Sequence, residues 1–192
     1  MLAAPALAFD DVFDQTYPLH AGGSFRLQNV NGSVELRGWD REEVQIHAVK
    51  SARRNLQDIE RVRIEVEAQP DAVNVNTRYP EDDGVEVYVE YRVRVPSRIL
   101  LPLVATVNGS VRITGVDGVG ESRSVNGNVE VTDCAGRLSA RTTNGGIRLE
   151  LRRLDPGGTL AAETVNGSVV LALPSSTAAE LDVRNLNGDF YS

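Results

Sequence analysis

The sequence predicts an all-β protein, specifically a parallel β-solenoid (β-helix) built from units of about 18–22 residues. Three observations predict this fold: a regularly spaced Asn-Gly dipeptide, apolar columns that recur at spacing two after each Asn, and a charged column that alternates in sign. The dipeptide occurs six times, and the last five copies are 18, 18, 22 and 21 residues apart. We expect the copies to form structural corners of the repeat: Asn31-Gly32, Asn108-Gly109, Asn126-Gly127, Asn144-Gly145, Asn166-Gly167 and Asn187-Gly188.

The residues after each Asn-Gly have the pattern of a strand with one buried face. Three residues after Asn the side chain is apolar in every copy: Val34, Val111, Val129, Ile147, Val169 and Phe190. A second apolar column follows two residues later, which is the side-chain period of a β-strand. Between the two columns, Arg112, Glu130 and Arg148 alternate in charge on the expected solvent face.

Parallel stacking of the units explains this alternation, because equivalent positions of successive units then lie about 4.8 Å apart. Opposite charges favour each other at that distance, and stacked Asn side chains can join their amides along the column. Asn-Gly is also the commonest tight turn of an antiparallel hairpin. An antiparallel β-sandwich or meander is therefore the alternative fold.

The first half of the chain is less regular than the second. Strict alternation of apolar and polar residues predicts strands over 44–49, 62–67, 73–77 and 85–95. We interpret residues 9–105 as an N-terminal β layer that caps the solenoid. Residues 106–192 are then the regular Asn-Gly units of the same continuous domain.

Composition and charge exclude several classes of protein. The 192 residues suffice for one domain, and 41% hydrophobic with 24% charged residues is typical of a folded chain. The net charge is −7 and neither half is basic, which argues against nucleic-acid binding. Outside the N-terminus no long apolar run is present, so we expect no transmembrane helix.

Few residues are candidates for catalysis or metal binding. A single cysteine, Cys134, excludes an intramolecular disulfide and a cysteine-rich zinc site, and His20 and His47 lie far apart. We therefore predict no metal and no cofactor. The nearest approach to an acid pair is Asp117 with Asp133, placed diagonally on adjacent units. Because glycoside cleavage uses two carboxyl groups about 5 to 10 Å apart, a polysaccharide-acting lyase or glycosidase is the alternative to a non-catalytic protein.

The N-terminal residues predict where the protein is located, and the C-terminal residues predict how it self-associates. Residues 1–8 are apolar and end in Ala6-Leu7-Ala8, a small-x-small pattern that signal peptidase cleaves, so we interpret them as a signal-peptide remnant. The protein is then exported to the periplasm or the cell surface. The last unit stops at Ser192, five residues after Asn187, which predicts an open strand edge through which the chain self-associates.

The segment Val30-Asn-Gly-Ser-Val-Glu-Leu-Arg-Gly-Trp39, the strand ending in Val95-Pro96 and the Thr-Val-Asn-Gly-Ser-Val repeats resemble a known bacterial family. It is a domain family of unknown function whose members are called putative adhesins. The resemblance covers roughly residues 24–192. It implies a β-solenoid in an exported or membrane-attached envelope protein, and it carries over no catalytic residues.

These observations predict a non-catalytic, adhesin-like module of the cell envelope. It would bind an envelope protein or a glycan, or serve as a structural scaffold. Aromatic side chains are common at binding surfaces, because they combine a large apolar area with a polar group. We expect Trp39, Tyr88 and Tyr91 to be surface contacts of this kind.

Overall fold

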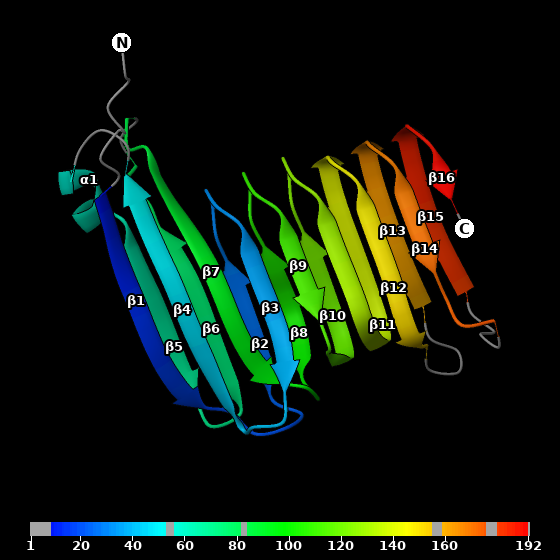
Figure 1. Cartoon of the computed structure of the whole chain (residues 1–192), viewed down its shortest axis with the longest axis horizontal. Coiled ribbons are helices and arrows are strands. Elements are labelled where there is room, and N and C mark those ends of the chain that lie inside the picture. The colour runs from blue at the N-terminus through cyan, green and yellow to red at the C-terminus, as the bar shows by residue number, and fades with distance from the viewer. Residues whose placement is uncertain (1–8, 53–55, 82–83, 155–158, 176–179, 192) are drawn as a thin grey trace, which may run out of the picture.

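The computed structural model describes residues 9–52, 56–81, 84–154, 159–175 and 180–191. The predicted signal-peptide remnant, residues 1–8, lies outside them. The described residues form sixteen strands and one short helix (Figure 1): β1 (Phe9–Pro18), β2 (Ser24–Gln28), β3 (Val34–Trp39), β4 (Glu43–Ala52), α1 (Leu56–Arg61), β5 (Arg63–Gln69), β6 (Ala72–Arg78), β7 (Val87–Pro96), β8 (Leu100–Ala105), β9 (Val111–Thr114), β10 (Asp117–Arg123), β11 (Val129–Asn144), β12 (Ile147–Arg153), β13 (Thr159–Asn166), β14 (Val169–Ala172), β15 (Glu180–Asn187) and β16 (Phe190–Tyr191). No helix in this described part is long and apolar enough to cross a membrane.

The sixteen strands belong to one sheet that folds over on itself (Figure 1). Its main path runs β1-β4-β7-β3-β9-β11-β10-β8-β2-β6-β5. The path turns at β11, because residues 129–132 pair with β9 and β12 whereas residues 138–144 pair with β13. At the ends of the path, β1 and β5 contact each other. The sheet is therefore nearly closed and barrel-like.

Two layers face each other across one hydrophobic core. We call β1, β4, β7, β3, β9, β12, β14 and β16 the first layer, and β5, β6, β2, β8, β10, β13 and β15 the second layer. β11 belongs to both, with residues 129–132 in the first layer and residues 138–144 in the second. Side chains alternate along each strand, so that β7 buries Val89 and Val93 and exposes Glu90 and Arg92. Each strand thus contributes one face to the core and one face to the outer surface.

The predicted fold class, a parallel β-solenoid, is wrong. β1 pairs with β4, β4 pairs with β7 and β5 pairs with β6 in antiparallel orientation, so the sheet is mixed. The reason is that apolar and polar residues alternate with period two in parallel and antiparallel strands alike. Strand direction depends on connections such as the two-residue turn Pro70-Asp71 between β5 and β6.

The units that follow Asn108 pair as their columns indicate. Val129 is in parallel register with Val111 on β9 and with Ile147 on β12, and Ile147 is in register with Val169 on β14. All four side chains are buried. The Asn-Gly steps are therefore not hairpin turns, which also excludes the alternative of an antiparallel meander for this part of the chain.

Candidate functional site

The six Asn residues of the repeat lie in one line where the chain enters the first layer. Their side chains form an amide ladder in which each Nδ2 donates to the Oδ1 of the preceding Asn at 2.8–3.0 Å: Asn108 to Asn31, Asn126 to Asn108, Asn144 to Asn126, Asn166 to Asn144 and Asn187 to Asn166. Because these amides satisfy one another, the ladder is a structural element of the corner.

The Gly residues of the repeat allow successive units to approach closely. A Cβ on Gly109 would lie 2.2 Å from the main-chain oxygen of Gly32, and a Cβ on Gly127 would lie 2.0 Å from that of Gly109. No side chain fits at these distances. Glycine is therefore required here by contact with the neighbouring backbone.

A further polar column at this corner was not identified from the sequence. Two residues before four of the six Asn, a buried Ser or Thr side chain donates to the carbonyl oxygen of the Gly in the preceding unit. Thr106 donates to Gly32 at 2.9 Å, and Ser124, Thr142 and Thr164 make the equivalent bonds at 2.8–2.9 Å. The available signal was a small polar residue at the same offset in every copy.

The structure brings the two candidate acids together, but around an arginine. Arg152 lies 2.6 Å from the Asp117 carboxylate and 2.5 Å from the Asp133 carboxylate. Its Nε also donates to the main-chain oxygen of Asp133 at 3.0 Å. Arg152 thus lies between the two carboxylates, where glycoside cleavage would need the bond to be cleaved. Asp117 and Asp133 therefore form an ion-paired clamp.

The predicted aromatic contacts have different environments. Tyr91 is buried, with its hydroxyl 2.7 Å from Thr77 Oγ1, so its prediction as a surface contact is wrong. It alternates with Tyr88 to the opposite face of β7, and Tyr88 is 43% exposed. Trp39 is half-buried and its Nε1 donates to the Glu43 oxygen at 2.9 Å.

Cys134, His20 and His47 do not form a reactive or metal-binding cluster with other described residues. Cys134 is buried, and burial raises the pKa of its thiol, so little of the reactive thiolate is present. His20 lies beside Glu42 and His47 beside Asp14, each at 3.4 Å. Within the described ranges, no three His, Cys, Asp or Glu side chains are close enough together to hold a metal ion.

An open depression of about 500 Å³ lies on the outer surface of the first layer. We call it the arginine depression, and its lining residues are Asp14, Glu35, Arg37, Gln45, His47, Arg92, Val93 and Arg94. Strand register explains why they meet. On one row Arg92 is in register with His47 on β4 and Glu35 on β3, and on the next row Arg94 is in register with Gln45 and Arg37.

The cations of this depression are only partly neutralised. Arg37 pairs with Glu35 at 2.6 Å. Arg92 has no hydrogen bond or ion pair with any described residue, and Arg94 contacts the Trp39 ring at 5.7 Å without a carboxylate partner in the described chain. Arg92 and Arg94 therefore present two guanidinium groups, side by side on β7, with their donors free for a ligand.

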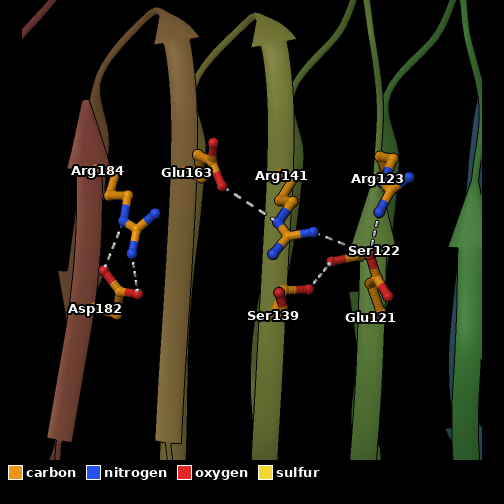
Figure 2. Close-up of polar contacts among 8 residues, drawn as sticks. All are labelled: Glu121, Ser122, Arg123, Ser139, Arg141, Glu163, Asp182 and Arg184. Atoms are coloured by element: carbon orange, nitrogen blue, oxygen red, sulfur yellow. Dashed lines mark hydrogen bonds and ion pairs between the residues drawn. The ribbon is translucent and has the colours of Figure 1, made fainter. Parts of the chain in front are cut away.

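The outer surface of the second layer provides a contrast. Figure 2 shows a part of it in which three arginines have acidic partners: Arg123 pairs with Glu121, Arg141 with Glu121 and Glu163, and Arg184 with Asp182. Three arginines face three carboxylates there. These six residues are neutral as a group, whereas the three arginines of the depression outnumber its two carboxylates within a chain of net charge −7.

The sequence did not indicate the arginine depression. Arg92 and Arg94 follow the alternation of a strand, as many other arginines of this chain do. The only local signal was that two successive outward positions of one strand are both arginine. Their lack of partners depends on β4 and β3, which the fold places on either side of β7.

No family model and no curated protein matches this chain. Solved structures resemble it at low identity. A "putative cell adhesion protein" from Clostridium sporogenes is 8% identical, with a TM-score of 0.43, over 94% of this chain and 98% of that chain. A "putative adhesin" from Bacteroides fragilis is 14% identical, with a TM-score of 0.37, over 95% and 97% of the two chains. A "putative lipid binding protein" from Parabacteroides distasonis is 9% identical, with a TM-score of 0.25, over 93% and 96%. At these values the likenesses assign neither a family nor an activity.

Proposed function

We propose that this protein is a non-catalytic, exported, adhesin-like module that binds an anionic polysaccharide in the arginine depression. One observation carries the proposal: Arg92 and Arg94 lie next to each other in an open depression without carboxylate partners in the described chain. Unpaired guanidinium groups in a strongly acidic protein are an effective local site for an oxyanion.

The spacing of the two arginines suits carboxylate or sulfate groups on a sugar chain. Outward side chains two residues apart on a strand are separated by about 7 Å, so Arg92 and Arg94 can each hold a separate oxyanion. Guanidinium binds such groups with two parallel hydrogen bonds. Gln45 lies at the same depression and offers an amide to sugar hydroxyls.

The shape of the site favours a polymer over a small molecule. The depression is open, and Glu35 of its lining lies in one register row with Arg112, Glu130 and Arg148 on the outer face of the first layer. A sugar chain can lie along such a row with one unit in the depression. Export, expected from residues 1–8, would bring the module to acidic glycans outside the cell.

The test compares two double variants of the full chain by calorimetric binding to uronate-rich and sulfated oligosaccharides. Arg92→Gln with Arg94→Gln removes the unpaired cations, and we expect at least about a tenfold loss of affinity, since each charge-assisted hydrogen bond contributes about 1.5–3 kcal/mol. Arg123→Gln with Arg141→Gln, on the second layer, is the matched control and should bind like the parent.

Two results would overturn the proposal. One is an equal loss of affinity in both double variants, and the other is equal binding of a neutral oligosaccharide of the same length. Tight binding of an acidic polypeptide without binding of any oligosaccharide would instead identify a protein partner for the same arginines. Binding through charge should also weaken with added salt.

A further inference from the structure

Asn-Gly is the dipeptide in which asparagine deamidates most readily, because glycine places little steric hindrance around its main-chain nitrogen. The deprotonated glycine nitrogen attacks Cγ of the asparagine, the bond from Cγ to the side-chain nitrogen breaks, and ammonia leaves. The resulting succinimide ring is opened by water to aspartate or isoaspartate. One water is consumed and one ammonia is released, so the reaction needs no oxidant, reductant or enzyme.

In five of the six Asn-Gly steps, the fold holds the attacking glycine nitrogen in a backbone hydrogen bond. In each of them the glycine N–H donates to the main-chain oxygen of the Asn in the next unit, at 2.8–3.1 Å: Gly32 to Asn108, Gly109 to Asn126, Gly127 to Asn144, Gly145 to Asn166 and Gly167 to Asn187. This hydrogen bond points the glycine N–H toward the next unit, away from its own Asn side chain, and opposes the loss of the proton that attack requires. Attack requires that the unit first opens locally.

The amide ladder also restrains the side chains that would be attacked. Asn108, Asn126, Asn144 and Asn166 each donate to one neighbour and accept from the other. Turning Cγ toward the adjacent glycine nitrogen breaks both bonds. Asn31 only accepts in the ladder, but the nitrogen of Gly32 is bonded and Gly32 is buried.

Asn187-Gly188 differs from the other five steps. The nitrogen of Gly188 has no hydrogen-bond partner among the described residues, and both Asn187 and Gly188 are exposed. The Asn187 side chain is held by one ladder bond, to Asn166 at 3.0 Å, and its Oδ1 accepts none from the described chain. We propose that Asn187 is a site of spontaneous deamidation and that the ladder protects the other five asparagines.

The modification would change the outer edge of β15. Aspartate at position 187 lacks the Nδ2 donor to Asn166 and adds a negative charge. Isoaspartate also inserts a methylene group into the backbone, which shifts the register of the strand. Both products therefore loosen the last bond of the ladder.

The full chain can be tested directly by peptide mapping. Cleavage after arginine places each Asn-Gly step on a separate peptide, and Asn187 lies on the peptide 185–192. After incubation of the folded chain at mildly alkaline pH, mass spectrometry should show aspartate and isoaspartate in that peptide at least about tenfold faster than in the other five. The reason is that each of those five units must first open to free its glycine nitrogen.

Two controls separate protection by the fold from local sequence. In denaturing urea the six steps should react at similar rates. In the folded Asn187→Gln variant, deamidation in peptide 185–192 should be lost while the other five peptides stay as in the parent. The proposal fails if another Asn-Gly step of the folded chain reacts as fast as Asn187.

Discussion

Two buried tyrosine hydroxyls predict that the stability of the protein is sensitive to alkali. The Tyr91 hydroxyl is 2.7 Å from Thr77 Oγ1, and the Tyr79 hydroxyl lies 3.1 Å from the Val87 oxygen and 3.3 Å from the Asn31 oxygen. Burial raises the pKa of Tyr79 to about 12 and raises the pKa of Tyr91 as well. The fold thus favours the neutral phenol at both positions.

Because both folded pKa values lie above that of an unfolded tyrosine, this contribution to stability is complete below about pH 10 and is lost as the pH rises toward about 12. We expect the free energy of unfolding of the parent to fall by up to about 1.4 kcal/mol per pH unit for each tyrosine in this window. The Tyr91→Phe variant should show a shallower fall, measured by urea unfolding across a pH series. A slope unchanged by Tyr91→Phe would assign the alkaline loss to other groups.

At the scale of the element, the Asn-Gly corner depends on direct contact between backbones. Gly145 and Gly146 are consecutive, yet only at the first would a Cβ collide with the backbone of the preceding unit. A Cβ on Gly145 would lie 2.2 Å from the Gly127 oxygen, whereas a Cβ on Gly146 would lie 3.4 Å from the Ser168 oxygen. Adjacent glycines of the same corner therefore have different structural roles.

This difference predicts opposite outcomes for two alanine variants. Gly145→Ala must separate two stacked units and should lower the free energy of unfolding by about 3 kcal/mol or more, or prevent folding. Gly146→Ala places its methyl at ordinary contact distance and should change stability by about 1 kcal/mol or less. Urea unfolding of the two variants measures both values. Similar effects in both would mean that the backbone contact between units is not limiting.

For the whole molecule, the two ends of the folded sheet are unlike. At one end β1 and β5 contact each other. At the other end β15 pairs only with β13, and β16 only with β14, among the described strands. Leu186 on β15 is 75% exposed. An unpaired strand edge with an exposed apolar residue is a template for pairing with another chain.

We therefore expect the 192-residue chain to self-associate through the β15 edge as its concentration rises. Leu186→Lys should shift the association to at least about tenfold higher concentration, because a charged edge strand opposes pairing. Val12→Lys is the control, since Val12 is 56% exposed on β1 at the closed end. Analytical ultracentrifugation distinguishes the variants. A parent that stays monomeric, or equal effects of both substitutions, would contradict this expectation.

The repeat shows how much of the fold was predictable. Its columns led to the correct register of Val111, Val129 and Ile147, because neighbouring units carry the same pattern at nearly constant spacing. The same columns led to the wrong fold class, since they carry no information on β1, β4 and β5, which pair antiparallel. Side-chain alternation is identical for both strand directions.

The candidate site was less predictable than the fold. Asp117 and Asp133 were recognised as neighbours, but the role of their pair depends on Arg152, which lies one unit further along the chain. Tyr91 was expected outside and lies inside. It shares a face of β7 with Val89 and Val93, so the alternation of the strand already indicated that Tyr91 faces the core.

The sequence by itself determined which residues of the Asn-Gly units are neighbours. Units of nearly equal length stack with equivalent positions in register, so the spacing of the repeat identifies the pairs. The tertiary structure alone decided the direction of the N-terminal strands and the existence of the arginine depression. That depression forms because β7 enters between β3 and β4, which places Arg92 and Arg94 beside residues from strands that are distant in sequence. Whether a charge is neutralised depends on such neighbours, and no local pattern contains them.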